Sequence, residues 1–383
     1  MKQGSYFQIL VIIILCLSCK DRYYPGINAP GTGYLVVEGT LNAGNTATSL
    51  LLSRTAAVNG GKGITPELNA SVAVEGNDNS VKQLIMNAPG NYQNTLELSA
   101  NNLYRVRIKT SDGKEYLSDF VPVKKTPEID SIGWKQNEKG MQLYVNTHDP
   151  ANSTVYYRWD FDETWEINSY YHSSLIYDSA SPDADKAGVR PRIFPKEDVF
   201  YCWKYGRSSN IYIGNSAKLT SDVIFQQPLN QIPAGDERLS VKYSILLRQY
   251  AMDKAAYEFY DLMKKNTESI GDIFGPLPSE LRGNIHCTSD PGEPVIGYIS
   301  ATAPTQKRVF ISRPDRWPFQ QFCETKFVIQ NRDSTREAFS SGVFIPIENT
   351  TREPRTDGYS ASSASCIDCT ARGGNLQKPS YWP

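Results

Sequence analysis

Histidine is rare in this sequence, with three residues in a chain of 383, and methionine occurs only five times. So few histidines leave little material for a His-based metal site or for acid–base chemistry by imidazole. An excess of charge of one sign is missing too, because 40 Lys and Arg balance 41 Asp and Glu. That balance argues against a nucleic-acid binder, which carries a basic surplus.

Common catalytic motifs are also absent. The sequence has no nucleophile elbow, no phosphate-binding glycine loop and no H-E-x-x-H spacing. His148, His172 and His286 are far apart in the chain, and each is best explained as a turn or strand-edge residue. We therefore predict no catalytic residue, no bound metal and no cofactor.

The only sustained apolar stretch lies at the N-terminus, over residues 7–17. It is too short for a membrane-spanning helix, which needs about 20 residues. Lys2 before it and the small Ser18 after it are typical of a cleaved export signal. Cys19 stands where a bacterial lipoprotein signal has its lipid acceptor, although an ordinary secretory signal with an incidental cysteine is the alternative. We predict a signal peptide over residues 1–18 and a membrane anchor through lipid on Cys19.

Five cysteines remain after the signal and the anchor are set aside: Cys202, Cys287, Cys323, Cys366 and Cys369. An odd number in an oxidising compartment predicts two disulfides and one free thiol. Cys366 and Cys369 have the spacing of redox and zinc sites. A redox site would need a βαβ context and a zinc site a second close pair, and neither is visible. Structural disulfides are the favoured interpretation.

Strand patterns begin after a Pro- and Gly-rich tether at residues 19–33. Seven short segments predict strands, of which 70–75 and 104–110 alternate with period two: 34–38, 48–55, 70–75, 81–86, 92–98, 104–110 and 115–123. This density of strands over residues 34–125 predicts an immunoglobulin-like β-sandwich.

Residues 126–383 are expected to form a larger β-rich domain with one inserted helix near 253–270. Asp253 is a candidate N-cap of that helix, and Ala256, Phe259, Tyr260 and Met263 repeat at helical spacing. The predicted fold class is therefore mainly β.

An acidic cluster lies in the strand predicted from Tyr156 onward, with the carboxylates Asp160, Asp162, Glu163 and Glu166. Paired carboxylates beside aromatic rings are found in glycosidases, and they also suit calcium or a solvated strand end. The last interpretation is favoured, because no second acidic cluster faces this one.

Aromatic residues gather in the same region, and five of them define a candidate surface for a ligand or partner: Trp159, Trp165, Tyr170, Tyr171 and Trp203. Tryptophan and tyrosine are favoured at interfaces. Packing in the core is the alternative.

Several phrases occur in an order that resembles a family of Bacteroidota outer-membrane lipoproteins, domain of unknown function 4249. They include Leu35-Val-Val-Glu-Gly39, Tyr156-Tyr-Arg-Trp-Asp-Phe161, Gly271 to Pro278, Gly283-Asn-Ile-His-Cys287 and Lys378-Pro-Ser-Tyr-Trp382. The resemblance implies a two-part β-rich lipoprotein whose gene often neighbours a TonB-dependent transporter. It implies no catalytic residues.

Together these observations predict an outer-membrane lipoprotein that is not an enzyme and acts as an accessory or binding component beside a TonB-dependent transporter. A surface glycan hydrolase that uses the acidic cluster, or a purely structural envelope protein, are the alternatives.

Overall fold

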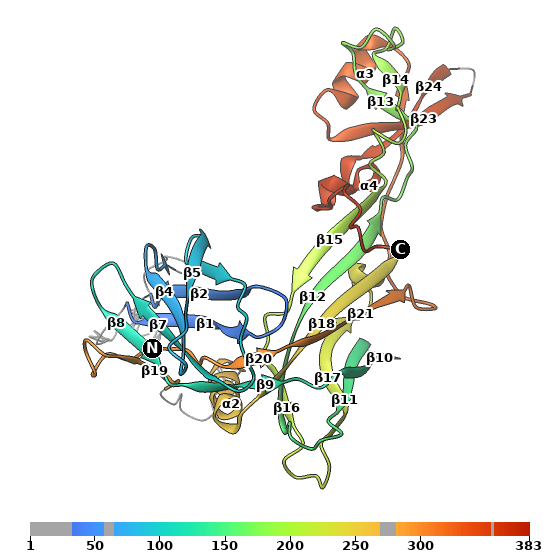
Figure 1. Ribbon diagram of the computed structural model, residues 1–383. Coiled ribbons are helices and arrows are strands. Elements are labelled where there is room, and N and C mark those ends of the chain that lie inside the picture. The colour runs from blue at the N-terminus through green and yellow to red at the C-terminus, as the bar shows by residue number, and fades with distance from the viewer. Residues whose placement is uncertain (1–32, 57–64, 269–280, 354–355) are drawn as a thin grey trace, which may run out of the picture.

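The computed structural model describes residues 33–56, 65–268, 281–353 and 356–383. Strands account for 48% of the structure and helices for 10%, which confirms the predicted mainly β fold. Figure 1 shows three modules in a row, namely a barrel, a central unit of long strands and a smaller distal module. The signal peptide 1–18, Cys19 and all of the tether except Gly33 lie outside the described residues.

Eight strands close the N-terminal module into a barrel. In their order around the barrel they are β7 (Leu103–Lys109), β4 (Ser71–Gly76), β5 (Val81–Ala88), β6 (Asn91–Asn94), β2 (Thr48–Arg54), β1 (Leu35–Asn42), β20 (Ala301–Ala303) and β9 (Val121–Lys125), which pairs with β7. Three short strands extend the sheet: β3 (Thr65–Pro66), β8 (Glu115–Ser118) and β19 (Ile285–Cys287). Alternate side chains, such as Leu35 and Val37 of β1, fill the interior.

The immunoglobulin-like sandwich predicted for residues 34–125 is therefore not confirmed. The alternation locates most of the strands, but β1 and β9 do not pair with each other. The short strand β20 lies between them and pairs in parallel with both, through Leu41 on one side and Val123 on the other. The barrel is thus closed by a segment that lies far away in the sequence.

The central module consists of two packed sheets. One contains β10 (Ile129–Asn137), β11 (Gly140–His148) and β17 (Val223–Pro233). The other contains β15 (Tyr201–Arg207), β12 (Tyr156–Asn168), β18 (Lys242–Met252) and β21 (Thr305–Ser312), with β16 (Tyr212–Asn215) beside β12. Their facing side chains form one core, which includes Leu143, Trp159, Phe161, Ile245 and Leu247.

The helix predicted near residues 253–270 is present as α2 (Lys254–Glu268). Asp253 caps it, since its carboxylate accepts a hydrogen bond from the Ala256 amide at 2.7 Å. Ala256 and Phe259 pack against Tyr298. The predicted end of the helix near residue 270 lies outside the described residues. In the described part of the chain, no helix has the length and apolar character needed to cross a bilayer.

The distal module lies at the end of the long hairpin made by β12 and β15 (Figure 1). It contains the pair β13 (Leu175–Tyr177) and β14 (Val189–Pro191), and the sheet of β22 (Lys326–Ile329), β24 (Thr356–Ser363) and β23 (Phe344–Arg352). The helix α3 (Arg332–Phe339) packs on that sheet, and α4 (Ala364–Ile367) follows β24. The expectation of a single helix is therefore wrong. The two additional helices are short and carry too few apolar residues to be recognised from periodicity. The 3-10 turns η1 (Glu237–Leu239) and η2 (Cys369–Arg372) complete the elements.

Candidate partner-binding surface

The predicted acidic cluster is divided between the two faces of β12, because successive side chains of a strand point to opposite sides. Asp160 and Asp162 share one face, where Arg248 donates to both, at 2.5 Å to Asp160 and at 2.6 Å to Asp162. Burial by itself would raise the pKa of Asp162, but the hydrogen bonds and charges of Arg248 and Arg207 hold that pKa below its usual value. A general acid needs the opposite shift in pKa, so Asp162 is not built like the acid of a glycosidase.

The other two carboxylates of the cluster are engaged elsewhere. Glu163 points into the central core, where it accepts hydrogen bonds from the Tyr243 hydroxyl at 2.6 Å and from Asn230 at 2.9 Å. Glu166 accepts from the indole nitrogen of Trp382 at 3.0 Å. Within the described residues, no group of three His, Cys, Asp or Glu side chains could hold a metal ion. The carboxylates of the acidic cluster therefore make three separate sets of structural contacts, one shared by Asp160 and Asp162 and one each for Glu163 and Glu166.

Two of the five aromatic residues predicted to form a surface are in the core, which corrects that prediction. Trp159 stacks on Tyr157, with ring centroids 5.7 Å apart, and its nitrogen donates to Gln249 at 2.8 Å. Trp203 is buried as well. Trp165 is half-buried and packs against two cores. Trp159 lies on the face of β12 that packs into the central core, whereas Trp203 is paired with Glu166 and is buried on the opposite face of the sheet.

Tyr170 and Tyr171 are placed differently, at the neck between the central and distal modules. Their rings meet edge to face with centroids 4.7 Å apart, and Tyr170 is 52% exposed. Both backbone amides donate to the carbonyl of Cys366, at 2.9 and 3.0 Å. The hydroxyl of Tyr171 donates to the carbonyl of Cys323 at 3.2 Å. These contacts fix the tyrosine pair against one disulfide.

The next residue, His172, connects this pair to a second group of rings. His172 lies 4.8 Å from Phe200 and 5.3 Å from Phe194, measured between ring centroids, and Tyr201 lies 4.8 Å from Phe200. Phe194 and Tyr201 are exposed. The imidazole also lies 3.4 Å from a carboxylate oxygen of Asp198.

Phe322 completes the surface beside Cys323, and it is 89% exposed. We name the whole set the distal aromatic surface: Tyr170, Tyr171, His172, Phe194, Phe200, Tyr201 and Phe322. Of these residues, only Tyr170 and Tyr171 were predicted from the sequence. The signal for Phe322 was its position next to a disulfide cysteine in a loop, where a large apolar side chain has no strand or helix to bury it.

Two disulfides fix this surface to the hairpin of β12 and β15. Cys202 of β15 bonds to Cys369 of η2, and Cys323 bonds to Cys366 of α4, each with 5.8 Å between Cα atoms. Cys287 is free and buried in the barrel. The expectation of two disulfides and one free thiol is thus confirmed.

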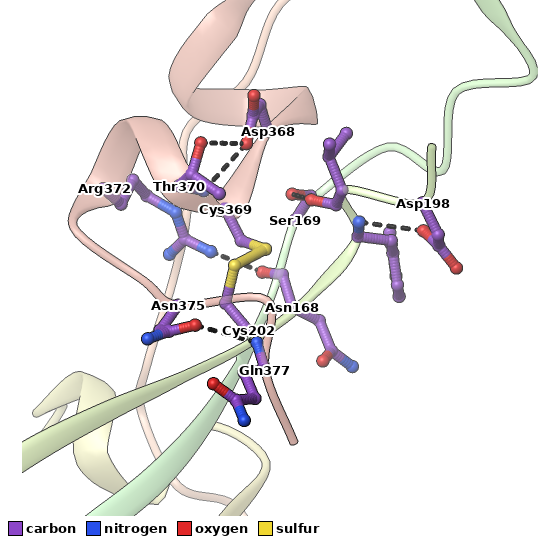
Figure 2. Close-up of a disulfide and its surroundings, with 12 residues drawn as sticks. Asn168, Ser169, Asp198, Cys202, Asp368, Cys369, Thr370, Arg372, Asn375 and Gln377 are labelled. Carbon is purple, nitrogen blue, oxygen red and sulfur yellow. Dashed lines mark hydrogen bonds between the residues drawn. A yellow bond between two sulfur atoms is a disulfide. The ribbon is translucent and has the colours of Figure 1, made fainter. Parts of the chain in front are cut away.

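Figure 2 shows the Cys202–Cys369 bond and its surroundings. Arg372 donates to the carbonyl of Asn168 at 2.6 Å and forms an ion pair with Glu237 at the same distance. The amide of Cys369 donates to the carbonyl of Val199 at 3.0 Å. The end of the chain is therefore attached to β12 and β15 by covalent and polar contacts together.

Residues 20–308 match the sequence family described as domain of unknown function (DUF4249). The chain belongs to the DUF4249 family. The match covers the barrel and most of the central module, and it ends within β21.

Other comparisons add little to the DUF4249 assignment. No curated protein matches the chain. Among solved structures, a chain described as a membrane-anchored protein from Corynebacterium diphtheriae is 8% identical with a TM-score of 0.16. That match covers 57% of this chain and 55% of the other.

Proposed function

We propose that this chain is a non-enzymatic outer-membrane lipoprotein that docks onto a transporter of the TonB-dependent class through its distal aromatic surface. The observation that carries the proposal is the exposure of Tyr170, Phe194, Tyr201 and Phe322 around the junction of the central and distal modules, which two disulfides fix. Large exposed apolar patches on a folded protein commonly mark interaction sites.

Rigidity supports this role. Aromatic side chains dominate the binding energy of interfaces, and a surface that is already ordered loses little conformational entropy on association. The Tyr171 hydroxyl bond and the Cys323–Cys366 disulfide attach the segments that carry Tyr170 and Phe322 to each other.

The arrangement of the modules supports it as well. The tether enters the protein just before β1 of the barrel, and the distal module lies at the opposite end of the molecule (Figure 1). A lipid on Cys19 would hold the barrel near the membrane and leave the distal aromatic surface free to reach a neighbouring protein.

Substitution of Phe322 tests the proposal. Phe322→Asp places a charge at the most exposed ring of the surface, and Phe225→Asp on β17 is the matched control, because Phe225 is 74% exposed in the central module. In native cells, we expect mild-detergent extraction to recover a TonB-dependent transporter with the unchanged protein and with the Phe225 variant. Recovery should fall at least tenfold with the Phe322 variant.

Equal recovery with both variants would contradict docking through this surface. Absence of any transporter, even with the unchanged protein, would favour a purely structural envelope role. Metabolic labelling with an alkyne fatty acid tests the anchor separately, since Cys19→Ala should abolish incorporation.

A further inference from the structure

A polar cleft separates the barrel from the central module, far from the distal aromatic surface. Its main cavity has a volume of about 720 Å³ and is lined by β1 and β2 on one side and by β12 and β18 on the other. A second cavity of about 510 Å³ continues toward α2. Glu38, Arg158, Asp160 and Arg207 line both, so the two cavities form one cleft. Ligand sites in proteins commonly have this size.

Arg158 is held between aromatic rings in the cleft. Its guanidinium lies over the ring of Tyr250 at 4.2 Å and near the ring of Tyr260 at 5.2 Å, and its side chain is only 18% exposed. Stacking on aromatic rings fixes the plane of a guanidinium and thus the directions of its N–H groups.

Few of those N–H groups are used by the protein. Within the described residues, the polar contacts of the guanidinium are a hydrogen bond to the Thr40 hydroxyl at 3.5 Å and an ion pair with Asp160 at 3.6 Å. An arginine has five N–H donors, so a half-buried arginine with two long contacts leaves donors directed at the cleft.

Glu38 supplies unused acceptors on the same wall. It lies on β1, its side chain is exposed, and no ion pair or hydrogen bond to its carboxylate is present among the described residues. The cleft therefore presents a fixed donor group and an unused acceptor group along its shared boundary.

The balance of charge selects the ligand class. Arg248 bonds to both Asp160 and Asp162, and Arg207 pairs with Asp162 at 3.0 Å. The carboxylates therefore neutralise these two arginines, and the cleft has no excess positive charge that would attract a polyanion. Exposed amides add neutral groups that both donate and accept: Asn45, Asn210 and Gln306. Hydroxyl groups of a sugar also donate and accept, which matches this lining.

We propose that the cleft between the barrel and the central module binds a neutral oligosaccharide, with Arg158 donating to its hydroxyl or ring oxygens and Glu38 accepting from its hydroxyls. This site does not depend on docking through the distal aromatic surface.

Calorimetric titration of the purified chain, without its signal and Cys19, provides the test. The probes are neutral hexasaccharides of glucose, xylose, mannose and N-acetylglucosamine, and a pool of uncharged hexapeptides serves for comparison. We expect at least one hexasaccharide to bind, while the peptides do not.

Two pairs of variants assign the binding to the cleft. Ala47→Trp fills the cavity from an exposed loop position, and Ala88→Trp adds the same side chain at an exposed barrel position outside it. Glu38→Gln removes the charged acceptor, and Glu138→Gln is its exposed control in the hairpin between β10 and β11. The first member of each pair should weaken binding at least tenfold, and the second should leave it within twofold.

The proposal is overturned if no hexasaccharide binds at millimolar concentration, or if only the peptides bind. It is also overturned if Ala47→Trp and Glu38→Gln bind as tightly as their controls. Unchanged circular dichroism spectra for all four variants establish that a loss of binding does not come from misfolding.

Discussion

Cys366 and Cys369 are separated by two residues, yet each is bonded to a different part of the chain. Cys366 bonds to Cys323 in the loop before β22, and Cys369 bonds to Cys202 in β15. Two cysteines with the spacing of redox and zinc motifs therefore form a structural junction. Their disulfides fix the distal module and the end of the chain to the central sheet.

Removal of the Cys202–Cys369 bond should lower the stability of the fold. The double variant Cys202→Ala/Cys369→Ala creates no new unpaired thiol beside Cys366. We expect it to lose about 2–5 kcal/mol in free energy of unfolding, because the unfolded chain is no longer constrained across 167 residues. Denaturant unfolding monitored by circular dichroism measures this loss. A reductant should destabilise the unchanged protein more than the variant, and equal effects would contradict the assigned pairing.

The backbone at Gly374 passes too close to this disulfide for any side chain. A Cβ atom there would lie 2.5 Å from the Cβ and 2.9 Å from the sulfur of Cys202. We expect Gly374→Ala to destabilise the protein by about 1–3 kcal/mol through overpacking. Gly133→Ala in β10 is the matched control, since nothing lies within 4 Å of its Cβ position. Thermal melting compares the two, and equal melting temperatures would show that the segment near Gly374 adjusts freely.

The free thiol of Cys287 should be protected from reagents in the folded protein. Cys287 is buried among the apolar side chains of the barrel. For the chain without Cys16 and Cys19, we expect a maleimide to label no thiol in the native state and one thiol after denaturation. Mass spectrometry gives the count. Labelling of the native protein, or of more than one thiol after denaturation without reductant, would disprove this arrangement.

Asp149 should make the stability of the fold depend on pH in the acidic range. Burial would raise its pKa, but the Ser153 hydroxyl and the amides of Ala151, Ser153 and Thr154 donate to it and lower its pKa to about 2. A carboxyl whose pKa is lower in the folded state stabilises the fold above its unfolded pKa, near 4, and loses that contribution as the pH falls toward 2.

The pH dependence is measured by unfolding experiments between pH 5 and pH 2. We expect Asp149→Asn to reduce the loss of stability over that range by about 1–2 kcal/mol, while the exposed control Asp315→Asn leaves it unchanged. An unaltered pH profile for Asp149→Asn would contradict the lowered pKa.

Closure of the barrel should require residues from the second half of the chain. A fragment spanning residues 33–126 lacks β20 and exposes the edges of β1 and β9. Unpaired strand edges promote aggregation, so we expect the fragment to elute as aggregates in size-exclusion chromatography. A monomeric fragment with the β-rich spectrum of a folded domain would show that β20 is dispensable.

Local patterns predicted the elements of this fold better than their assembly. Apolar, β-branched runs located β1 and β2, period-two alternation located β4 and β7, and helical spacing with the Asp253 cap located α2. The position of β20 was not predictable, because three residues carry no periodicity and their partners are far away in sequence.

The candidate sites, too, were predicted as individual residues better than as assembled surfaces. The sequence identified Tyr170 and Tyr171, but it also proposed Trp159 and Trp203, which are buried on opposite faces of the sheet of β12 and β15. It grouped the carboxylates of β12 into one cluster, whereas the pleat of the strand separates Asp160 from Glu163.

By itself, the sequence determined a mainly β fold, one long amphipathic helix and enough cysteine for two disulfides with one thiol left over. These properties depend on composition and on contacts between near neighbours. The tertiary structure decided which cysteines pair, how the barrel closes and which aromatic rings remain exposed. Each of these depends on segments brought together from distant parts of the chain, and their contacts arise only when the whole core is packed.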